Sequence, residues 1–147
     1  MVYLETITKD NWLKAISLRV REDQVGFVAS NAVSLAQLNF LENFHAKGIY
    51  LDEEMIGFAL YGMDEEDNEY WIYRMMIDQK HQGKGYGVKA IQLIIDDIKT
   101  MKEEHHQTIT LSYEPVNQHA KYVYEKLGFQ DVEGIINEGE QVMRFTF

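Results

Sequence analysis

The stretch "DQKHQGKGYGVKAI", residues 78–91, places three glycines within five positions and then changes to the spacing of an amphipathic helix. Glycine is costly to order, so a cluster marks backbone that bends unusually or that another group approaches closely. Without β-carbons, the amides of residues 83–87 can point together at an anion, and the N-terminus of the following helix adds about half a positive charge. The loop is therefore predicted to hold a pyrophosphate, with Lys84 beside it.

Two better-known phosphate loops do not fit this stretch. A Walker loop requires glycine, four residues and then Gly-Lys-Ser/Thr, which the chain does not contain. A dinucleotide-binding fingerprint requires a third glycine where Val88 stands. The remaining alternative is a plain strand-to-helix connection, which needs one glycine at most.

The segments around the loop predict an α+β fold in a single domain, residues 1–147. Strands are expected at 2–8, 48–52, 55–63, 70–77, 108–113, 129–136 and 141–147, and helices at about 8–20, 35–44, 85–101 and 117–128. Thr8 and Ser34 are expected to cap the first two helices, and Gly128 to close the last. Residues 21–31 are expected to be an irregular connection, and 64–69 a polar turn. This order predicts a mixed, mostly antiparallel sheet of six to seven strands with four helices packed on it.

Composition narrows the class of function. The chain has no cysteine, which excludes disulfides, thiolate metal sites and cysteine nucleophiles, and its five histidines follow no metal-binding spacing. The net charge of −10 opposes nucleic acid and anionic membranes; it is compatible either with an ordinary acidic surface that aids solubility or with a cationic partner. Because the sequence shows no signal peptide and no apolar run of about 18 residues, we expect a cytoplasmic protein with no metal.

Two blocks of the chain resemble the GCN5-related N-acetyltransferase (GNAT) superfamily. Gln82-Gly83-Lys84-Gly85-Tyr86-Gly87 fits that family's Gln/Arg-x-x-Gly-x-Gly/Ala loop for the pyrophosphate of acetyl-coenzyme A. The second block, "NQHAKYVYEKLGF" at residues 117–129, fits Asn-x-x-Ala-x-x-x-Tyr-x-x-x-Gly-Phe. The two blocks stand in the family's order and separation, and the resemblance covers about residues 50–130.

The resemblance implies acetyl-coenzyme A as cosubstrate and a sheet whose central strand pair splays apart. The pantetheine arm would pair with the main chain of the splayed strand, as an added strand does, and an amide near Met76 would polarise the thioester carbonyl. For Asn117 the alternative to cofactor contact is a helix cap alone. A homodimer is usual for the family and is expected here. The implied cofactor-binding residues are Met75, Met76, Ile77, Gln82, Gly83, Lys84, Gly85, Tyr86, Gly87 and Asn117.

Acetyl transfer to an amine requires the ammonium to lose a proton and the departing thiolate to gain one. Tyr124 occupies the family's acid position, and the alternative is that it only packs within its helix. Some polyamine acetyltransferases of the superfamily place a glutamate on the splayed strand, where this chain has Tyr73. Glu114, which follows a predicted strand and precedes Pro115, is therefore the expected base, unless it is an exposed loop carboxylate.

Residues 21–37 resemble the matching segment of bacterial spermine/spermidine acetyltransferases. A polyamine carries several ammonium groups, which carboxylates and aromatic faces bind. The expected function is therefore acetylation of a polyamine, a small cationic amine. The alternatives are a different amine (an aminoglycoside, a protein N-terminus or a small metabolite) and a non-catalytic acyl-coenzyme A sensor. The candidate substrate-binding residues are Glu22, Asp23, Glu42, Trp71 and Tyr113.

Overall fold

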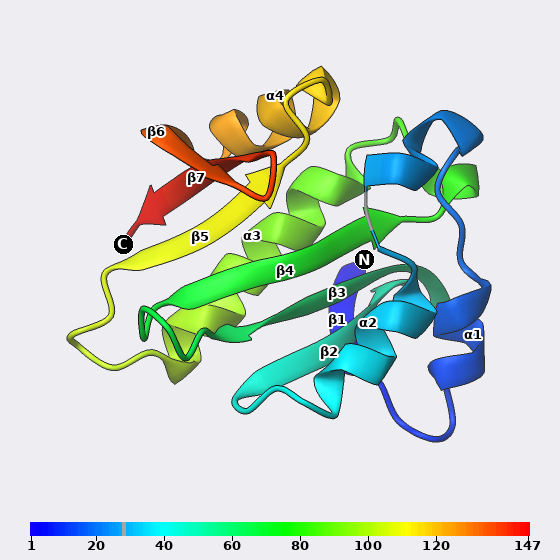
Figure 1. The fold of residues 1–147 in the computed structure, drawn as a ribbon. Coiled ribbons are helices and arrows are strands. Elements are labelled where there is room, and N and C mark those ends of the chain that lie inside the picture. The colour runs from blue at the N-terminus through cyan, green and yellow to red at the C-terminus, as the bar shows by residue number, and fades with distance from the viewer. Residues whose placement is uncertain (28) are drawn as a thin grey trace.

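The computed structural model describes residues 1–27 and 29–147, and its helices and strands follow one another in the predicted order (Figure 1). The elements are β1 (Val2–Thr6), α1 (Trp12–Ser17), the 3₁₀ helix η1 (Glu22–Phe27), α2 (Asn31–Leu38), β2 (Phe44–Leu51), β3 (Glu54–Met63), β4 (Tyr70–Ile77), the 3₁₀ helix η2 (Gln79–His81), α3 (Tyr86–Met101), β5 (Thr108–Tyr113), α4 (Gln118–Lys126), β6 (Gln130–Asn137) and β7 (Glu140–Thr146). Among the described helices, none combines the length and the apolar character needed to cross a bilayer.

The seven described strands form one mixed sheet in the order β1-β2-β3-β4-β5-β7-β6. Neighbouring strands are antiparallel except β4 and β5, which are parallel. The β4–β5 ladder holds at two positions, where Tyr70 lies opposite Ile109 and Trp71 opposite Thr110. Beyond them the two strands diverge, and Figure 1 shows α3 passing behind the gap. The prediction of an α+β fold with a splayed central strand pair is confirmed.

The sheet separates two apolar cores. β3 contributes to both because alternate side chains of a strand point to opposite faces. Ala59 and Tyr61 belong to the core under α3, while Phe58 and Leu60 belong to the core under α1 and α2. The α3 side chains that close the first core are all fully or almost fully buried: Ala90, Ile91, Ile94, Ile95 and Ile98. Both faces of β3 are therefore packed, and β4, which borders the gap, likewise contributes Ile72 to the first core and Met76 to the second.

The first helix is shorter than its apolar spacing predicted. It covers Trp12–Ser17 rather than residues 8–20, and Asn11, not Thr8, holds the N-cap position. The chain leaves the helix because the Arg19 amide donates a hydrogen bond to the Asp78 carboxylate at 2.8 Å. This bond joins the segment after α1 to the end of β4. It links residues 59 positions apart, so local spacing does not reveal it.

The second helix begins four residues earlier than predicted. Ser30, rather than Ser34, is its N-cap, and the Ser30 hydroxyl accepts a hydrogen bond from the Val33 amide at 3.2 Å. Ser34 is buried inside the helix and donates to the Ser30 carbonyl. The helix ends at Leu38, and Phe44 begins β2 instead of ending a helix. Two serines at helical spacing give the same capping signal, so the sequence alone does not choose between them.

The connection at residues 21–31, expected to be irregular, contains the short 3₁₀ helix η1. Val28, which belongs to the same connection, lies outside the described residues.

Candidate active site

The glycine loop closes one end of a groove of about 340 Å³, here called the loop groove. Gly83 and Gly85 have φ angles of +78° and +83°, in the left-handed region that other residues rarely adopt. A β-carbon added to either residue meets no atom within 4 Å, so the space before the loop is open. Gln82 fixes the loop by donating from Nε2 to the Ile77 carbonyl at 2.8 Å. The loop is thus preformed and has room for a ligand.

Helix α3 begins at the loop groove without a side-chain cap. Gly85 holds the N-cap position and has no side chain to accept hydrogen bonds from the first amides. The amides of the first turn therefore face the groove without an intrahelical partner, and together with the helix dipole they favour an anion. Lys84 is exposed and is not among the described residues that line the groove. The glycine loop, without the Lys84 side chain, therefore lines this end of the groove.

Strand β4 borders the loop groove with its main chain. Residues 75–77 pair with residues 57–59 of β3 on one side, while on the other side the ladder with β5 has already ended. Tyr73 has no opposite residue on β3, so it is the extra residue of a β-bulge. Next to the glycine loop, β4 therefore presents a free edge to which an extended ligand can add as a strand would.

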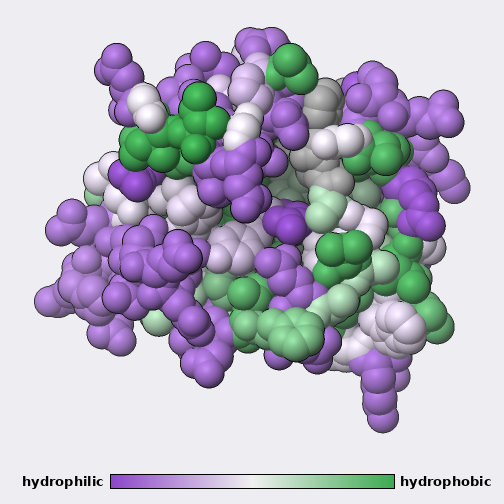
Figure 2. All heavy atoms as spheres, in the orientation of Figure 1, coloured by the Kyte–Doolittle hydropathy of each residue, from purple (hydrophilic) through white to green (hydrophobic). Residues whose placement is uncertain are grey.

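A second cavity, of about 910 Å³, is bordered by β4, the β3–β4 turn and the β6–β7 hairpin; we call it the acidic cavity. Figure 2 shows a hollow near the middle of this face of the molecule, bordered largely by hydrophilic side chains. Trp71 and Tyr73 supply aromatic faces to the cavity. Carboxylates outnumber guanidinium groups by five to two, so the cavity favours a cation. The charged lining residues are Asp64, Glu66, Asp67, Glu138, Glu140, Arg74 and Arg144.

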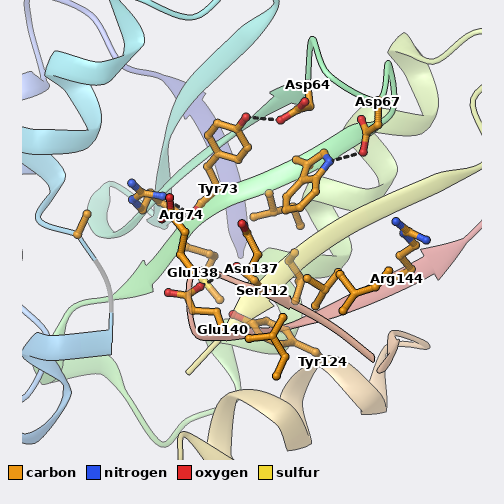
Figure 3. A pocket seen from close by; sticks show the side chains of 18 of the residues that line it. Asp64, Asp67, Tyr73, Arg74, Ser112, Tyr124, Asn137, Glu138, Glu140 and Arg144 are labelled. Carbon is orange, nitrogen blue, oxygen red and sulfur yellow. Dashed lines mark hydrogen bonds between the residues drawn. The ribbon is translucent and has the colours of Figure 1, made fainter. Parts of the chain in front are cut away.

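Hydrogen bonds hold two of these carboxylates beside the aromatic rings (Figure 3). The Tyr73 hydroxyl donates to Asp64, and the indole nitrogen of Trp71 donates to Asp67 at 2.8 Å. Burial, reinforced by the Asp64 carboxylate, raises the pKa of Tyr73 well above its usual value, so Tyr73 stays protonated as a donor. The position where some polyamine acetyltransferases carry a glutamate thus has a tyrosine here, with a carboxylate from the neighbouring turn bound to it.

The loop groove and the acidic cavity meet at Tyr124. Among the described lining residues, the two compartments share only Met75 and Tyr124. The ring of Tyr124, a residue of α4, packs beside the rings of Tyr113 and Phe129. Burial, followed by the negative charge of Glu140, raises the pKa of Tyr124 to about 12. A protonated hydroxyl therefore stands where the contents of the two compartments would touch.

Most of the predicted cofactor residues lie together. Asn117 both lines the loop groove and caps α4, because its side chain accepts a hydrogen bond from the Ala120 amide at 3.2 Å. The structure is therefore compatible with both interpretations of Asn117. The other predicted residues that line this groove are Met75, Met76, Ile77, Gln82, Gly83, Gly85, Tyr86 and Gly87.

The predicted catalytic and acceptor residues are more scattered. Tyr124 and Trp71 line the acidic cavity. Tyr113 is buried, and its hydroxyl donates to Asp131 at 3.1 Å, which connects β5 to β6. Like Tyr113, none of the four predicted carboxylates is among the described residues that line either compartment. These carboxylates are Glu22, Asp23, Glu42 and Glu114.

Sequence reasoning missed the carboxylates that do line the acidic cavity. They lie in the turn at residues 64–67 and at residues 138–140, where the β6–β7 turn passes into β7; the sequence assigned both stretches to connections. A run of acidic residues in a turn usually indicates solvent exposure, and only the strand order brings these two turns to one cavity. In the part of the chain that the structure describes, no group of three or more His, Asp or Glu side chains is placed to hold a metal ion.

Comparison with known proteins identifies the family. A profile of the acetyltransferase (GNAT) family matches residues 12–129. The chain belongs to this family. This GNAT chain is 28% identical over 148 residues to the spermine/spermidine N(1)-acetyltransferase of Bacillus subtilis (strain 168), an alignment that covers 97% of this chain and 96% of the relative.

Solved structures share the GNAT fold at lower sequence identity. The aminoglycoside acetyltransferase AAC(6')-Ib in complex with coenzyme A aligns with a TM-score of 0.80 at 18% identity, over 99% of this chain and 95% of that one. The PaiA N-acetyltransferase from Thermoplasma acidophilum in complex with coenzyme A aligns with a TM-score of 0.71 at 14% identity, over 100% and 99% of the two chains. These likenesses confirm the fold that the sequence predicted.

Proposed function

We propose that this GNAT protein transfers the acetyl group of acetyl-coenzyme A to a primary amine of a polyamine such as spermidine or spermine. One observation carries the proposal: an anion-binding groove with a free strand edge meets, at Tyr124, a cavity lined by an excess of carboxylates. The groove fits a pyrophosphate and an extended pantetheine arm, and the cavity fits a flexible polycation. The name of the Bacillus subtilis relative states the same reaction for that protein.

Acetyl-coenzyme A supplies the activated acetyl group as a thioester. The amides of residues 83–87 bind its diphosphate, and the main chain of residues 75–77 pairs with its pantetheine arm. The Met76 amide donates to the thioester carbonyl, where negative charge develops during attack.

The acetyl group passes directly to the amine while both substrates are bound. The chain has no cysteine to carry an acetyl group, and the two compartments already meet at one point. The neutral amine attacks the thioester carbonyl, and the tetrahedral intermediate expels the thiolate. Tyr124 gives that thiolate its proton, which makes coenzyme A a better leaving group.

The far end of the polyamine binds at the rim of the acidic cavity. Asp64 and Asp67 are held there by Tyr73 and Trp71, so each carboxylate stands beside an aromatic face. An ammonium bound in this place gains both Coulomb and cation–π attraction. The reacting ammonium then lies farther in, toward Tyr124.

A second candidate acceptor is an amine in a molecule that also carries a carboxylate, such as the N-terminus of an acidic peptide. Arg74 and Arg144 line the acidic cavity, and neither forms an ion pair with another described residue. Arg74 donates instead to the Tyr73 carbonyl and to Gln37, and its Nε is buried without a partner in the described chain. Guanidinium groups without an acid partner suit a carboxylate of the substrate.

A panel of amines tests the acceptor. Acetyl-coenzyme A consumption is measured with spermidine, spermine, an aminoglycoside and an acidic N-terminal peptide side by side. We expect the highest kcat/KM with a polyamine. Brisk turnover of the peptide or the aminoglycoside, with none of either polyamine, would overturn the polyamine proposal. Calorimetric binding of coenzyme A without turnover of any amine would favour the sensor instead.

We also propose that the protein forms a homodimer. Strand β7 pairs with β5 on one side and β6 on the other, so among the described strands β6 is the edge of the sheet at this end. Light scattering at several protein concentrations measures the oligomeric state.

A further inference from the structure

We propose that Glu140 is the base that removes the proton of the acceptor ammonium, with Ser112 positioning its carboxylate. This inference rests on the proposed acetyl transfer and assigns a residue that sequence reasoning did not select. It places the base on β7, across the gap from β4, rather than on β4 itself.

Glu140 occupies a defined place at the start of β7, the strand next to β5 on the side away from the gap. It is the first residue of β7, just before Gln141 and Val142 pair with the last two residues of β5. Its Oε1 accepts a hydrogen bond from the Ser112 hydroxyl at 2.6 Å. A carboxylate held by a hydroxyl on the adjacent strand loses rotational freedom before the substrate arrives, which is what a base needs.

Glu140 also lies close to the proposed acid. Both Glu140 and Tyr124 line the acidic cavity, and the Glu140 charge contributes to the raised pKa of the Tyr124 hydroxyl. Figure 3 shows Tyr124, Glu140 and Ser112 gathered at one end of the cavity, with Asp64 and Asp67 at the other end in this view. The acid and the base of the proposed reaction therefore stand on the same side of the cavity.

The other carboxylates of the acidic cavity are less suited to this task. Asp64 and Asp67, which accept hydrogen bonds from Tyr73 and Trp71, lie at the end of the cavity away from Tyr124 in Figure 3. Glu138 belongs to the same hairpin as Glu140 but is exposed, whereas Glu140 is partly buried. The remaining charged or titratable groups that line the cavity are Glu66, Arg74, Arg144, Tyr73 and Tyr124.

The proton transfers balance over the proposed reaction. The ammonium gives one proton to the Glu140 carboxylate, which releases it to solvent through the open cavity. The neutral amine nitrogen forms a bond to the thioester carbon, and the carbon–sulfur bond then breaks. The thiolate takes the Tyr124 proton, and the second proton lost by nitrogen restores the Tyr124 hydroxyl. The products are the acetylated amine and the thiol form of coenzyme A, with one proton released.

Binding of the ammonium couples Glu140 to Tyr124. A positive charge beside Glu140 offsets the negative charge that opposes ionisation of Tyr124. Tyr124 therefore becomes a better acid when an amine is in place, which couples proton donation to occupancy of the acidic cavity.

The test compares Glu140→Gln with Glu138→Gln. Both variants remove one negative charge from the same hairpin, and the glutamine at 140 keeps an oxygen for the Ser112 hydroxyl. With spermidine, we expect Glu140→Gln to lower kcat by about 10²-fold or more, and the acidic limb of the pH profile of kcat/KM to disappear. Glu138→Gln should raise KM with a much smaller change in kcat. Calorimetric binding of coenzyme A by each variant checks that the fold is intact.

Ser112→Ala tests the positioning role. Losing this bond should lower kcat with little change in the KM for spermidine, because the Glu140 carboxylate is no longer held in one orientation. Ser112→Thr, which keeps a hydroxyl, should restore kcat. A kcat of Ser112→Ala equal to that of the wild type would overturn the role of Ser112.

Three outcomes separate the base role of Glu140 from the proposed function. Glu140→Gln with a kcat near that of the wild type and an unchanged pH profile would overturn the base role while polyamine acetylation stands. A rise in KM alone, equal to that of Glu138→Gln, would also overturn it, since Glu140 would then act only through its charge. If wild-type protein acetylates no amine, the proposed function itself falls.

Discussion

Two tyrosines on helix α4 lie in different environments although they are close together in the sequence. Tyr122 and Tyr124 are two positions apart, so they project from different sides of the helix. Tyr122 is 61% exposed, whereas Tyr124 packs between Tyr113 and Phe129 and borders both compartments. Of the two, Tyr122 lines only the loop groove, whereas Tyr124 lines both compartments.

Replacing Tyr124 with phenylalanine removes one oxygen and keeps the ring. We expect Tyr124→Phe to lower kcat by about 10²–10⁴-fold, because the thiolate would leave without a positioned acid. The affinity for coenzyme A, measured by calorimetry, should change little. Tyr70→Phe is the matched control, since Tyr70 is a buried aromatic outside the described lining of both compartments. Full activity of Tyr124→Phe across the pH range would exclude Tyr124 as the acid.

At the scale of elements, the loop before α3 contains glycines that serve different purposes. Gly85 has a φ of +83°, which a β-carbon opposes. Gly87 lies inside the helix, and its added β-carbon would stand 3.9 Å from Met75 and 4.0 Å from Ile77, which are ordinary contacts. Backbone conformation requires the first glycine, while the second is compatible with alanine.

Alanine variants at Gly85 and Gly87 test this difference between the two glycines. Gly85→Ala should lower the free energy of unfolding by about 1–2 kcal/mol and weaken coenzyme A binding, because relief of the strain moves the amides of the loop. Gly87→Ala should leave stability equal or higher by about 0.5 kcal/mol and retain coenzyme A binding. Thermal unfolding and calorimetry measure both effects. Equal loss of binding in the two variants would contradict the assignment.

The contrast between the two compartments explains what the sequence can predict. Five of the six consecutive residues 82–87 line the loop groove, so a local pattern was enough to locate this part of the groove. The acidic cavity combines the β3–β4 turn, β4, β5 and the β6–β7 hairpin, which only the strand order brings together. Glu140 meets Ser112 across 28 positions of the chain, a relation set by the register of β5 and β7. No periodicity along the sequence encodes that register.

The same distinction applies to the ends of the helices. Helix α3 begins and ends where its sequence predicted, since its long apolar stripe packs on the sheet. Helix α1 stops early because Asp78, far along the chain, binds the Arg19 amide. A tertiary contact therefore ended α1 before its apolar pattern ended.

At the scale of the whole molecule, burial of tyrosines makes stability depend on alkaline pH. Tyr61 is fully buried and donates to Asp97 at 2.6 Å, and burial followed by this bond raises its pKa far above 10. In the unfolded chain each tyrosine loses its proton near pH 10. Above that pH the folded state holds more protons, so stability falls as pH rises. Burial also raises the pKa of Tyr70, Tyr73, Tyr113 and Tyr124.

Urea unfolding between pH 8 and pH 11 measures this effect. We expect the free energy of unfolding to be level up to about pH 9.5 and then to decline. Tyr61→Phe should cost about 1–3 kcal/mol at pH 8, because the partly buried Asp97 carboxylate loses its donor, and should show a shallower decline above about pH 10. A free energy that stays constant to pH 11 would contradict the expected loss of stability at alkaline pH.

The meeting of the two compartments at Met75 and Tyr124 has a consequence for ligand design. Two compartments that share a boundary suit a bivalent molecule. In such a molecule an acceptor amine would be joined to the sulfur of coenzyme A by a linker about as long as an acetyl group. Each half would raise the effective concentration of the other. The acceptor half would contact the β6–β7 hairpin and the turn at residues 64–67, which line the acidic cavity.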